Sequence, residues 1–292
     1  MVDKVIQSPP VPDVKPADET GAKIKDESVQ PSASRLAARD LIEGCLMWRL
    51  WGTLGLQDIR QRYRRSILGP FWLTLSLAIL VCTLGLLYGQ LMGKSYREYV
   101  PHLTLGFISW QLINGLVSDG CKVFISAEAW IKSVRSPLSL FVWQLTWRHL
   151  VIAAHNMLVY VGVALLLGIW CGLEGLLVVP GLLLVLANAV WVMLLVGILC
   201  ARFRDIPPIV SSLMRLAFFV TPILWMPDQL GTRSHLALFN PFTYFVEVLR
   251  GPLLGYVPSA ATWMLALAVT IVGWSVTWPM FVRFRGRVPY WL

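Results

Sequence analysis

Residues 60–72 have the sequence RQRYRRSILGPFW, in which four arginines are followed by Gly-Pro and then by an apolar segment. That segment is almost uninterrupted from Phe71 to Leu91, about the 20 residues that an α-helix needs to cross a bilayer. Basic residues at the start of a transmembrane segment stay on the cytoplasmic side. The stretch therefore predicts a first transmembrane helix that starts in the cytoplasm and runs outward.

The composition of the whole chain excludes an ordinary soluble domain. Hydrophobic residues make up 57% and charged residues only 14%, whereas soluble domains carry about 25% charged residues. We therefore predict an all-α polytopic membrane protein. The formal net charge of +9 comes mostly from basic residues beside apolar segments, where they set topology and meet anionic lipid. It gives no reason to expect a nucleic-acid partner.

Six apolar segments are predicted to cross the membrane. They lie at about residues 71–91, 103–120, 149–170, 175–199, 206–226 and 260–282. If all six cross, the most basic loops fall on the side of the arginine cluster, and the loops on the other side carry much less net charge. Glu247 and Arg250 are assigned to one of these outer loops. The positive-inside rule then places both termini in the cytoplasm.

The segments before the first span have two different characters. Residues 1–35 are rich in proline and charged residues, which predicts a disordered cytoplasmic tail. In residues 36–66, Leu41, Cys45 and Trp48 begin a series of apolar residues spaced by three and four. This spacing predicts an amphipathic helix at the membrane interface or against a partner. A plain linker before the membrane is the alternative.

Two loops are too long to be simple connections. The cytoplasmic loop 121–147 alternates apolar and basic residues around residues 128–132, which predicts a short amphipathic helix parallel to the membrane. The outer stretch 236–256 is apolar but is interrupted at Asn240-Pro241 and at Gly251-Pro252. We predict outer re-entrant half-helices between spans five and six, because irregular backbone at membrane depth must be covered by protein.

Motifs of catalysis and metal binding are missing from the sequence. It contains no H-E-x-x-H and no G-x-S-x-G, and its five cysteines show no C-x-x-C spacing. Gly93-Lys94-Ser95 resembles the end of a phosphate-binding loop, but Tyr88 stands where the first glycine is required. We therefore expect no catalytic residue, no metal site and no cofactor bound by this chain.

Polar and aromatic residues within the spans leave alternatives open. Arg215 lies about nine residues into the fifth span, where an arginine either faces a pore and meets a phosphate or extends to the interface. Trp72 and Trp225 lie near span ends. An interfacial aromatic belt explains them, and stacking against sugar rings is the second interpretation.

Several stretches resemble one family of transporters. RYRRSILGPFWLTLS (62–76) resembles the start of the first helix in type-2 ABC transporter permeases that export cell-surface polysaccharides. The segments 203–225 and 238–255 are similar to the fifth span and outer half-helices of that family, and 105–120 and 131–140 fit its second span and the following loop. The resemblance covers about residues 54–285. The nearest subgroup exports O-antigen and capsular polysaccharide, with teichoic-acid permeases as relatives.

The resemblance implies a transport subunit and not an enzyme. Such a permease has six spans, forms a homodimer and binds two copies of a separate ABC ATPase subunit, which holds ATP and Mg²⁺. Its cargo is an undecaprenyl-diphosphate-linked polysaccharide, moved outward across the bacterial inner membrane. The amphipathic segment and the loop 121–137 transmit force from the ATPase. The family often has an aromatic pair before the loop proline, where this chain has Arg135-Ser136.

Candidate site residues follow from the resemblance and from charge. The residues predicted to dock the ATPase are Glu128, Trp130, Lys132, Arg135, Arg204 and Asp205. At the cytoplasmic mouth, Arg62, Arg64 and Arg65 are candidates to bind the lipid diphosphate, because arginine clusters suit phosphate oxygens. Membrane topology alone explains any one of these arginines equally well.

Two other functions were compared with polysaccharide export. The first is a type-2 permease for capsule, teichoic acid or a small lipid or drug, and the long outer segment and basic start favour the glycan. The second is a membrane enzyme such as a glycan-lipid transferase. That enzyme needs acidic residues at the membrane face, and Asp119 and Glu128 are isolated in the sequence.

Overall fold

The computed structural model describes residues 32–62, 64, 69, 71–91, 93–227 and 239–292. Within these ranges the chain forms helices joined by turns and contains no strand, as predicted for an all-α protein. The predicted disordered tail, 1–35, falls outside the described residues as far as residue 31. Its last three positions belong to the first helix, which begins at Ala33.

The described residues form a series of helices along the chain. In order they are α1 (Ala33–Leu46), α2 (Trp48–Arg62), α3 (Phe71–Leu91), α4 (Tyr96–Gly120), α5 (Glu128–Ser133), α6 (Ser139–Leu167), η1 (Leu173–Leu177), α7 (Val178–Arg202), α8 (Ile206–Val220), α10 (Pro241–Leu253), α11 (Ala260–Phe284), η3 (Arg285–Arg287) and α12 (Val288–Trp291).

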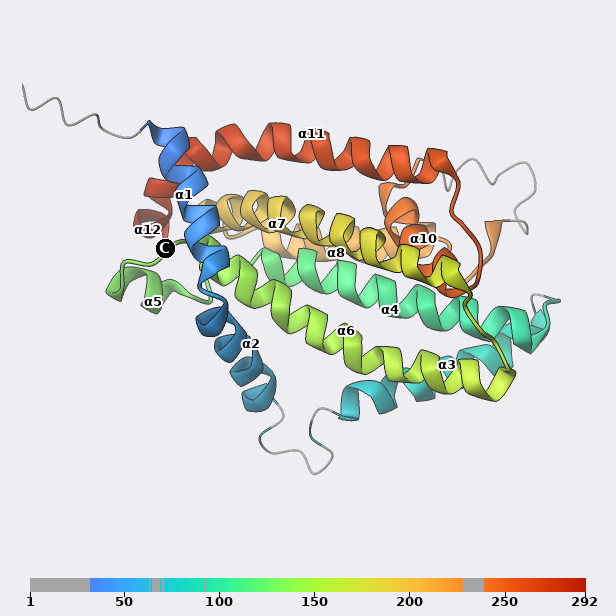
Figure 1. The fold of residues 1–292 in the computed structure, drawn as a ribbon. Coiled ribbons are helices and arrows are strands. Elements are labelled where there is room, and N and C mark those ends of the chain that lie inside the picture. Colours follow the sequence, from blue (N-terminus) through green and yellow to red (C-terminus); the bar gives the residue numbers. More distant parts are fainter. Residues whose placement is uncertain (1–31, 63, 65–68, 70, 92, 228–238) are drawn as a thin grey trace, which may run out of the picture. The chain divides into compact units, whose positions relative to one another are not determined.

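Figure 1 shows how residues 33–292 are arranged. The long helices α4, α6, α7 and α11 run in the same general direction, with α8 among them. Helices α1, α5 and α12 gather at one end of this bundle, which we call the α5 end. Helix α10 lies at the other end, which we call the α10 end.

Four helical segments among the described residues are long and apolar enough to cross a membrane. They are Phe71–Gly89, Ser139–Leu167, Leu173–Arg202 and Ala260–Trp291. They contain the predicted first, third, fourth and sixth spans, apart from a few residues at the ends of some of them. This set supports a polytopic membrane protein.

Helix α4 contains the predicted second span, 103–120, and begins earlier, at Tyr96. It contacts α3, α6, α7, α8 and α10, so most of its side chains are buried. Its polar residues lower its hydropathy, and they have partners on neighbouring turns or helices. Asn156 of α6 donates a hydrogen bond to Gln111 at 2.8 Å, and Ser118 donates to Asn114 at 3.1 Å. The first of these bonds joins α6 to α4, as polar side chains do between helices in an apolar environment.

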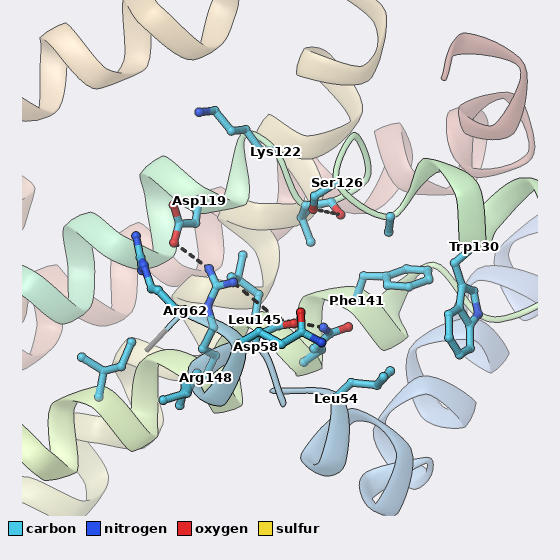
Figure 2. A pocket seen from close by; sticks show the side chains of 16 residues that line it. Leu54, Asp58, Arg62, Asp119, Lys122, Ser126, Trp130, Phe141, Leu145 and Arg148 are labelled. Carbon is cyan, nitrogen blue, oxygen red and sulfur yellow. Dashed lines mark hydrogen bonds and ion pairs between the residues drawn. The ribbon is translucent and has the colours of Figure 1, made fainter. Parts of the chain in front are cut away.

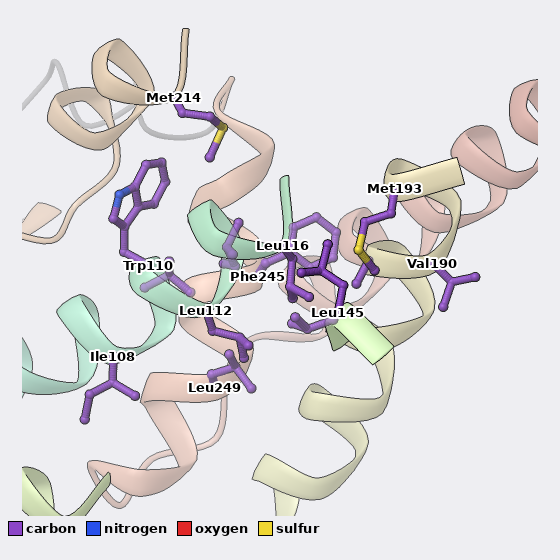
Figure 3. Close-up of a cluster of buried hydrophobic side chains, with 14 of the residues drawn as sticks. Ile108, Trp110, Leu112, Leu116, Leu145, Val190, Met193, Met214, Phe245 and Leu249 are labelled. Carbon is purple, nitrogen blue, oxygen red and sulfur yellow. The ribbon is translucent and has the colours of Figure 1, made fainter. Parts of the chain in front are cut away.

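The core of the bundle is built on α4. Figure 3 shows Trp110, Leu112 and Leu116 of this helix among buried side chains that include Met193 of α7 and Phe245 of α10. These side chains are 7% exposed or less. Because apolar side chains from helices far apart in the sequence interlock here, α4 fixes the spacing of the helices around it.

The predicted fifth span, 206–226, is not one continuous helix. Helix α8 ends at Val220, after 15 residues or about 22 Å of axial rise, which is shorter than the hydrocarbon core of about 30 Å. Pro222 disfavours helical backbone at the residue before it, which accounts for the end of α8. Thr221 is buried there. Its hydroxyl accepts a hydrogen bond of 2.8 Å from the side-chain amide of Asn240, the residue before α10.

Helix α10 occupies the described part of the predicted outer stretch, 236–256. The Asn240 side chain accepts a hydrogen bond from the Phe242 amide at 3.0 Å and so caps the start of the helix. The predicted interruption at Gly251-Pro252 falls inside α10, because a proline in the last turn removes only one bond of the helix. Gly255 ends the turn with a φ of 87°.

The predicted amphipathic segment, 36–66, contains two helices, α1 and α2, separated at Met47. Both pack against the first half of α6. Gly44 lies against Ser139, and Gly55 against Trp147 and the Gln144 carbonyl, so closely that a Cβ atom on either glycine would lie within about 3 Å of α6 atoms. Glycine therefore allows both helices to approach the α6 backbone.

The buried carboxylate of Asp40 fixes α1 on the start of α6. It accepts hydrogen bonds from the backbone amides of Leu138 at 3.2 Å and Ser139 at 3.0 Å, and Ser139 Oγ donates to the Asp40 carbonyl at 2.6 Å. Arg285 donates to the same carboxylate at 3.2 Å and to the Leu36 carbonyl at 2.7 Å. A negative charge at a helix N-terminus satisfies unpaired amides and the helix dipole together.

Replacement of Asp40 by alanine is expected to lower the free energy of unfolding by about 2 kcal/mol, because two buried amides and the Arg285 guanidinium lose their acceptor. Thermal unfolding of the purified chain in detergent measures the effect. The matched control is Glu43→Ala on the same helix, because the half-exposed Glu43 carboxylate pairs with Arg39 and has no other side-chain partner among the described residues. Equal loss of stability in the two variants would contradict the capping role.

Candidate functional site

The helix α5 and the turns around it form the exposed surface at the α5 end. Lys132 donates to the Glu128 carboxylate at 2.7 Å, one helical turn away. This hydrogen bond and the positive charge of Lys132 lower the pKa of the Glu128 carboxyl, and the charge of Arg204 adds a smaller effect. The pair is therefore ionised at neutral pH, and it loses its charge pairing only as the pH falls through the lowered pKa.

The other residues predicted to dock the ATPase share this end of the bundle. Trp130 is 37% exposed on α5, and Arg135 is exposed in the segment after it. Arg204 and Asp205 are exposed in the turn between α7 and α8, where Asp205 makes no side-chain hydrogen bond to the α8 amides. Solvent-exposed side chains of both signs thus lie around one short helix.

A pocket of about 590 Å³ opens next to α5 (Figure 2). Its walls come from α2, the end of α4, the turns after α4, α5 and the first half of α6. The lining residues are Leu54, Asp58, Ile59, Gln61, Arg62, Asp119, Lys122, Val123, Ser126, Ala127, Trp130, Phe141, Gln144, Leu145, Arg148 and Ile152. The volume is in the range of pockets that bind small molecules.

Arg148 is the centre of an ion network in this pocket. Its two terminal nitrogens donate to Asp119 at 2.7 Å and to Asp58 at 3.4 Å. Gln144 donates to the same Asp58 oxygen at 3.0 Å, and His149 Nε2 lies 3.0 Å from Asp119 Oδ2. One arginine of α6 therefore links α2 to the end of α4.

The three arginines proposed for the lipid diphosphate have different positions. Arg62 is exposed at the end of α2 and lines the pocket. Arg64 is exposed in the following turn and is not among the lining residues. Arg65 lies outside the described residues.

The remaining candidates are on α3 and around α8. Arg215 is exposed on α8 and donates to Ser212 at 2.9 Å, one turn closer to the start of the helix. Trp72 is 50% exposed at the start of α3. The Trp225 indole, after the end of α8, donates to the Phe219 carbonyl at 3.1 Å. Neither Arg215 nor either tryptophan lines the pocket next to α5.

The structure contains a second charged cluster, around two residues that were predicted to lie in an outer loop, Glu247 and Arg250. Arg250 of α10 is only 2% exposed. It donates to Glu247 at 2.7 Å and to the Pro222 carbonyl at 2.6 Å, and its Nη1 lies 3.0 Å from His102 Nε2. Tyr256 donates to the other Glu247 oxygen at 2.7 Å. The spacing of three between Glu247 and Arg250 indicates a helical pair, but only the fold reveals His102 and Pro222 as neighbours.

Comparison with known protein families identifies the family to which the helical bundle belongs. The sequence profile described as ABC-2 type transporter matches residues 49–254, which is most of the chain. The chain belongs to this family. The match starts at the beginning of α2 and ends after α10, so it includes both the pocket and the buried Arg250 cluster.

The chain is also similar, at low sequence identity, to individual proteins whose function is named. It is 22% identical over 236 residues to an O-antigen export system permease protein RfbA of Myxococcus xanthus, covering 79% of this chain and 89% of that protein. It is 22% identical over 239 residues to a protein of the same name from Klebsiella pneumoniae, covering 78% and 90%. The resemblance to type-2 ABC permeases is thereby confirmed, and the chain is a multi-pass membrane protein of a transport family.

Proposed function

We propose that this chain is the permease subunit of an ATP-driven exporter that moves an undecaprenyl-diphosphate-linked polysaccharide, such as O-antigen, outward across the bacterial inner membrane. The observation that carries the proposal is the match to two permeases named for O-antigen export over nearly their whole length. In the proposed state two copies of the chain pair with two copies of an ABC ATPase. Each copy has six spans, both termini are cytoplasmic, and α10 forms the outer re-entrant segment.

The α5 end fits the role of the ATPase-docking surface. On this surface the basic side chains Lys132, Arg135 and Arg204 outnumber the acidic Glu128 and Asp205, and this excess of positive charge suits an acidic partner. Trp130 supplies a large exposed ring of the kind enriched at interfaces. The contacts behind α5 are rigid, because Asp40 and the two glycine approaches hold α1 and α2 against α6. Movement of the docked ATPase would then shift whole helices between two arrangements.

The exposed position of Arg215 supports a polar path on the outside of a single copy. A charged side chain on a membrane helix is costly against lipid, so it favours a neighbour that is polar or aqueous. Ser212 and Arg215 of α8 are exposed together, and Ser76 and Thr83 of α3 are exposed as well. We propose that a second copy covers these faces and that the glycan passes between the two copies.

The function itself is tested by deleting the gene in its native strain and labelling surface glycan. Deletion is expected to remove the glycan from the surface while lipid-linked glycan accumulates inside, and a plasmid copy restores export. Unchanged surface glycan with altered drug tolerance would instead favour a permease for a small lipid or drug. Purified chain that converts a lipid-linked sugar without any ATPase would identify the membrane enzyme.

Charge reversal at the docking surface tests the ATPase contact. Lys132→Glu combined with Arg135→Glu is expected to reduce export at least tenfold and to remove the effect of the permease on ATP hydrolysis, because the basic surface becomes acidic. Membrane insertion should be unchanged, since both side chains are exposed. The control Arg97→Glu reverses an exposed charge on α4, near the α10 end. Normal export by the double variant would contradict the docking role.

The two interpretations of Arg215 predict different export phenotypes. If Arg215 faces the glycan path, Arg215→Ala is expected to lower export at least tenfold and Arg215→Lys to retain most of it, since lysine keeps the charge. If the side chain only extends to the interface, both variants export normally. Quantification of surface glycan at equal permease levels separates the two cases.

A further inference from the structure

The pocket next to α5 carries an unbalanced positive charge. Its lining includes three basic residues and two acidic ones, which gives a formal charge of +1 (3 − 2). The two acids are Asp58 and Asp119, and both accept hydrogen bonds from Arg148. The side chains of Arg62 and Lys122 form no hydrogen bond or ion pair with another described residue, and Arg62 interacts with Asp119 only through its charge.

The charged and apolar walls of this pocket are separated. Figure 2 shows Arg62, Asp119 and Lys122 on one side of the pocket and Phe141 and Trp130 on the other. The lining also includes the apolar side chains of Ile59, Val123 and Leu145. An anionic group that binds at the two free cations therefore places the rest of its ligand against an aromatic and aliphatic wall.

We propose that this pocket binds the phosphate-bearing headgroup of the lipid-linked substrate, with the phosphate oxygens at Arg62 and Lys122 and the first sugar ring against Trp130. The proposal rests on the proposed function and names a binding site within it. Arginine and lysine form strong charge-assisted bonds to phosphate oxygens, and flat aromatic rings suit the apolar face of a sugar. About 590 Å³ is enough for a ligand of several linked groups.

The position of Arg148 gives the pocket a way to respond to its ligand. A phosphate beside Arg62 and Lys122 lies next to the Asp119 carboxylate that holds Arg148. Repulsion between the two anions weakens the Arg148–Asp119 pair, and the guanidinium turns toward the phosphate. Because Arg148 also bonds Asp58, the change reaches α2 and α4 together, next to the turns that lead to α5. An occupied pocket thus has different contacts at the docking surface from an empty one.

The binding site is tested with permease and ATPase together in lipid nanodiscs. The probe is a short-chain polyprenyl diphosphate carrying one N-acetylhexosamine, and inorganic pyrophosphate serves as the second probe. Arg62→Gln and Lys122→Gln are expected to weaken probe binding about tenfold each, and the double variant by about a hundredfold. The matched control is Arg60→Gln, which removes the same charge from an exposed position of α2 outside the pocket lining.

The two probes distinguish a site for the lipid-linked headgroup from a site for free phosphate. Binding of the lipid probe but not of pyrophosphate assigns the pocket to the lipid-linked headgroup, and Trp130→Leu then weakens the lipid probe further. Equal binding of both probes means a general phosphate site, which would overturn the sugar contact at Trp130. Wild-type binding in the double variant overturns the pocket assignment.

The result is also distinguishable from a failure of the proposed function. If the double variant exports surface glycan like Arg60→Gln while the deletion strain exports none, the function stands and the pocket proposal fails. If binding persists but the variants lose the coupling of ATP hydrolysis, the pocket serves the ATPase contact and the headgroup proposal is wrong. If the deletion strain keeps its surface glycan, the proposed function fails first.

Discussion

The bonds of the Asp40 carboxylate to the first amides of α6 are the interaction on which the α5 end depends. Helix α6 supplies Phe141, Gln144, Leu145 and Arg148 to the pocket, so its starting point sets the position of that wall. Without an acceptor, its first amides would be buried and unpaired. The same carboxylate also receives Arg285, which follows α11. One side chain thus joins α1, the start of α6 and the turn that follows α11.

Local patterns in the sequence predict most of the helices but not the contacts between them. The span 71–91 coincides with α3, because an apolar run of that length has one stable form in lipid. Hydropathy alone underrates α4, whose polar residues meet partners on other helices. The early end of α8 follows from Pro222, and the continuation of α10 through Pro252 follows from the place of that proline in a last turn. These outcomes depend on neighbours and not on composition.

The candidate site likewise has a part that the sequence predicts and a part that it does not. The resemblance to type-2 permeases identified exposed residues of α5 and of the turn after α7, which lie at one end of the bundle. The pocket was not predicted, because three separate stretches of the chain, 54–62, 119–130 and 141–152, build it, and Asp58, Asp119 and Arg148 form no motif within their own stretches. The sequence analysis treated Asp119 as isolated, whereas the structure gives it two partners, Arg148 and His149. Pairs 29 to 90 residues apart leave no periodic pattern.

The buried Arg250 has a consequence for how the chain is made. Its acceptors on α4 and at Pro222 precede it in the sequence by 148 and 28 residues. During synthesis, therefore, both acceptors leave the ribosome before the guanidinium does. A chain truncated before α10 leaves the His102 and Pro222 acceptors without the arginine, whereas α10 on its own keeps Glu247 as the partner of Arg250. The order of synthesis thus makes both acceptors available before the arginine that requires them.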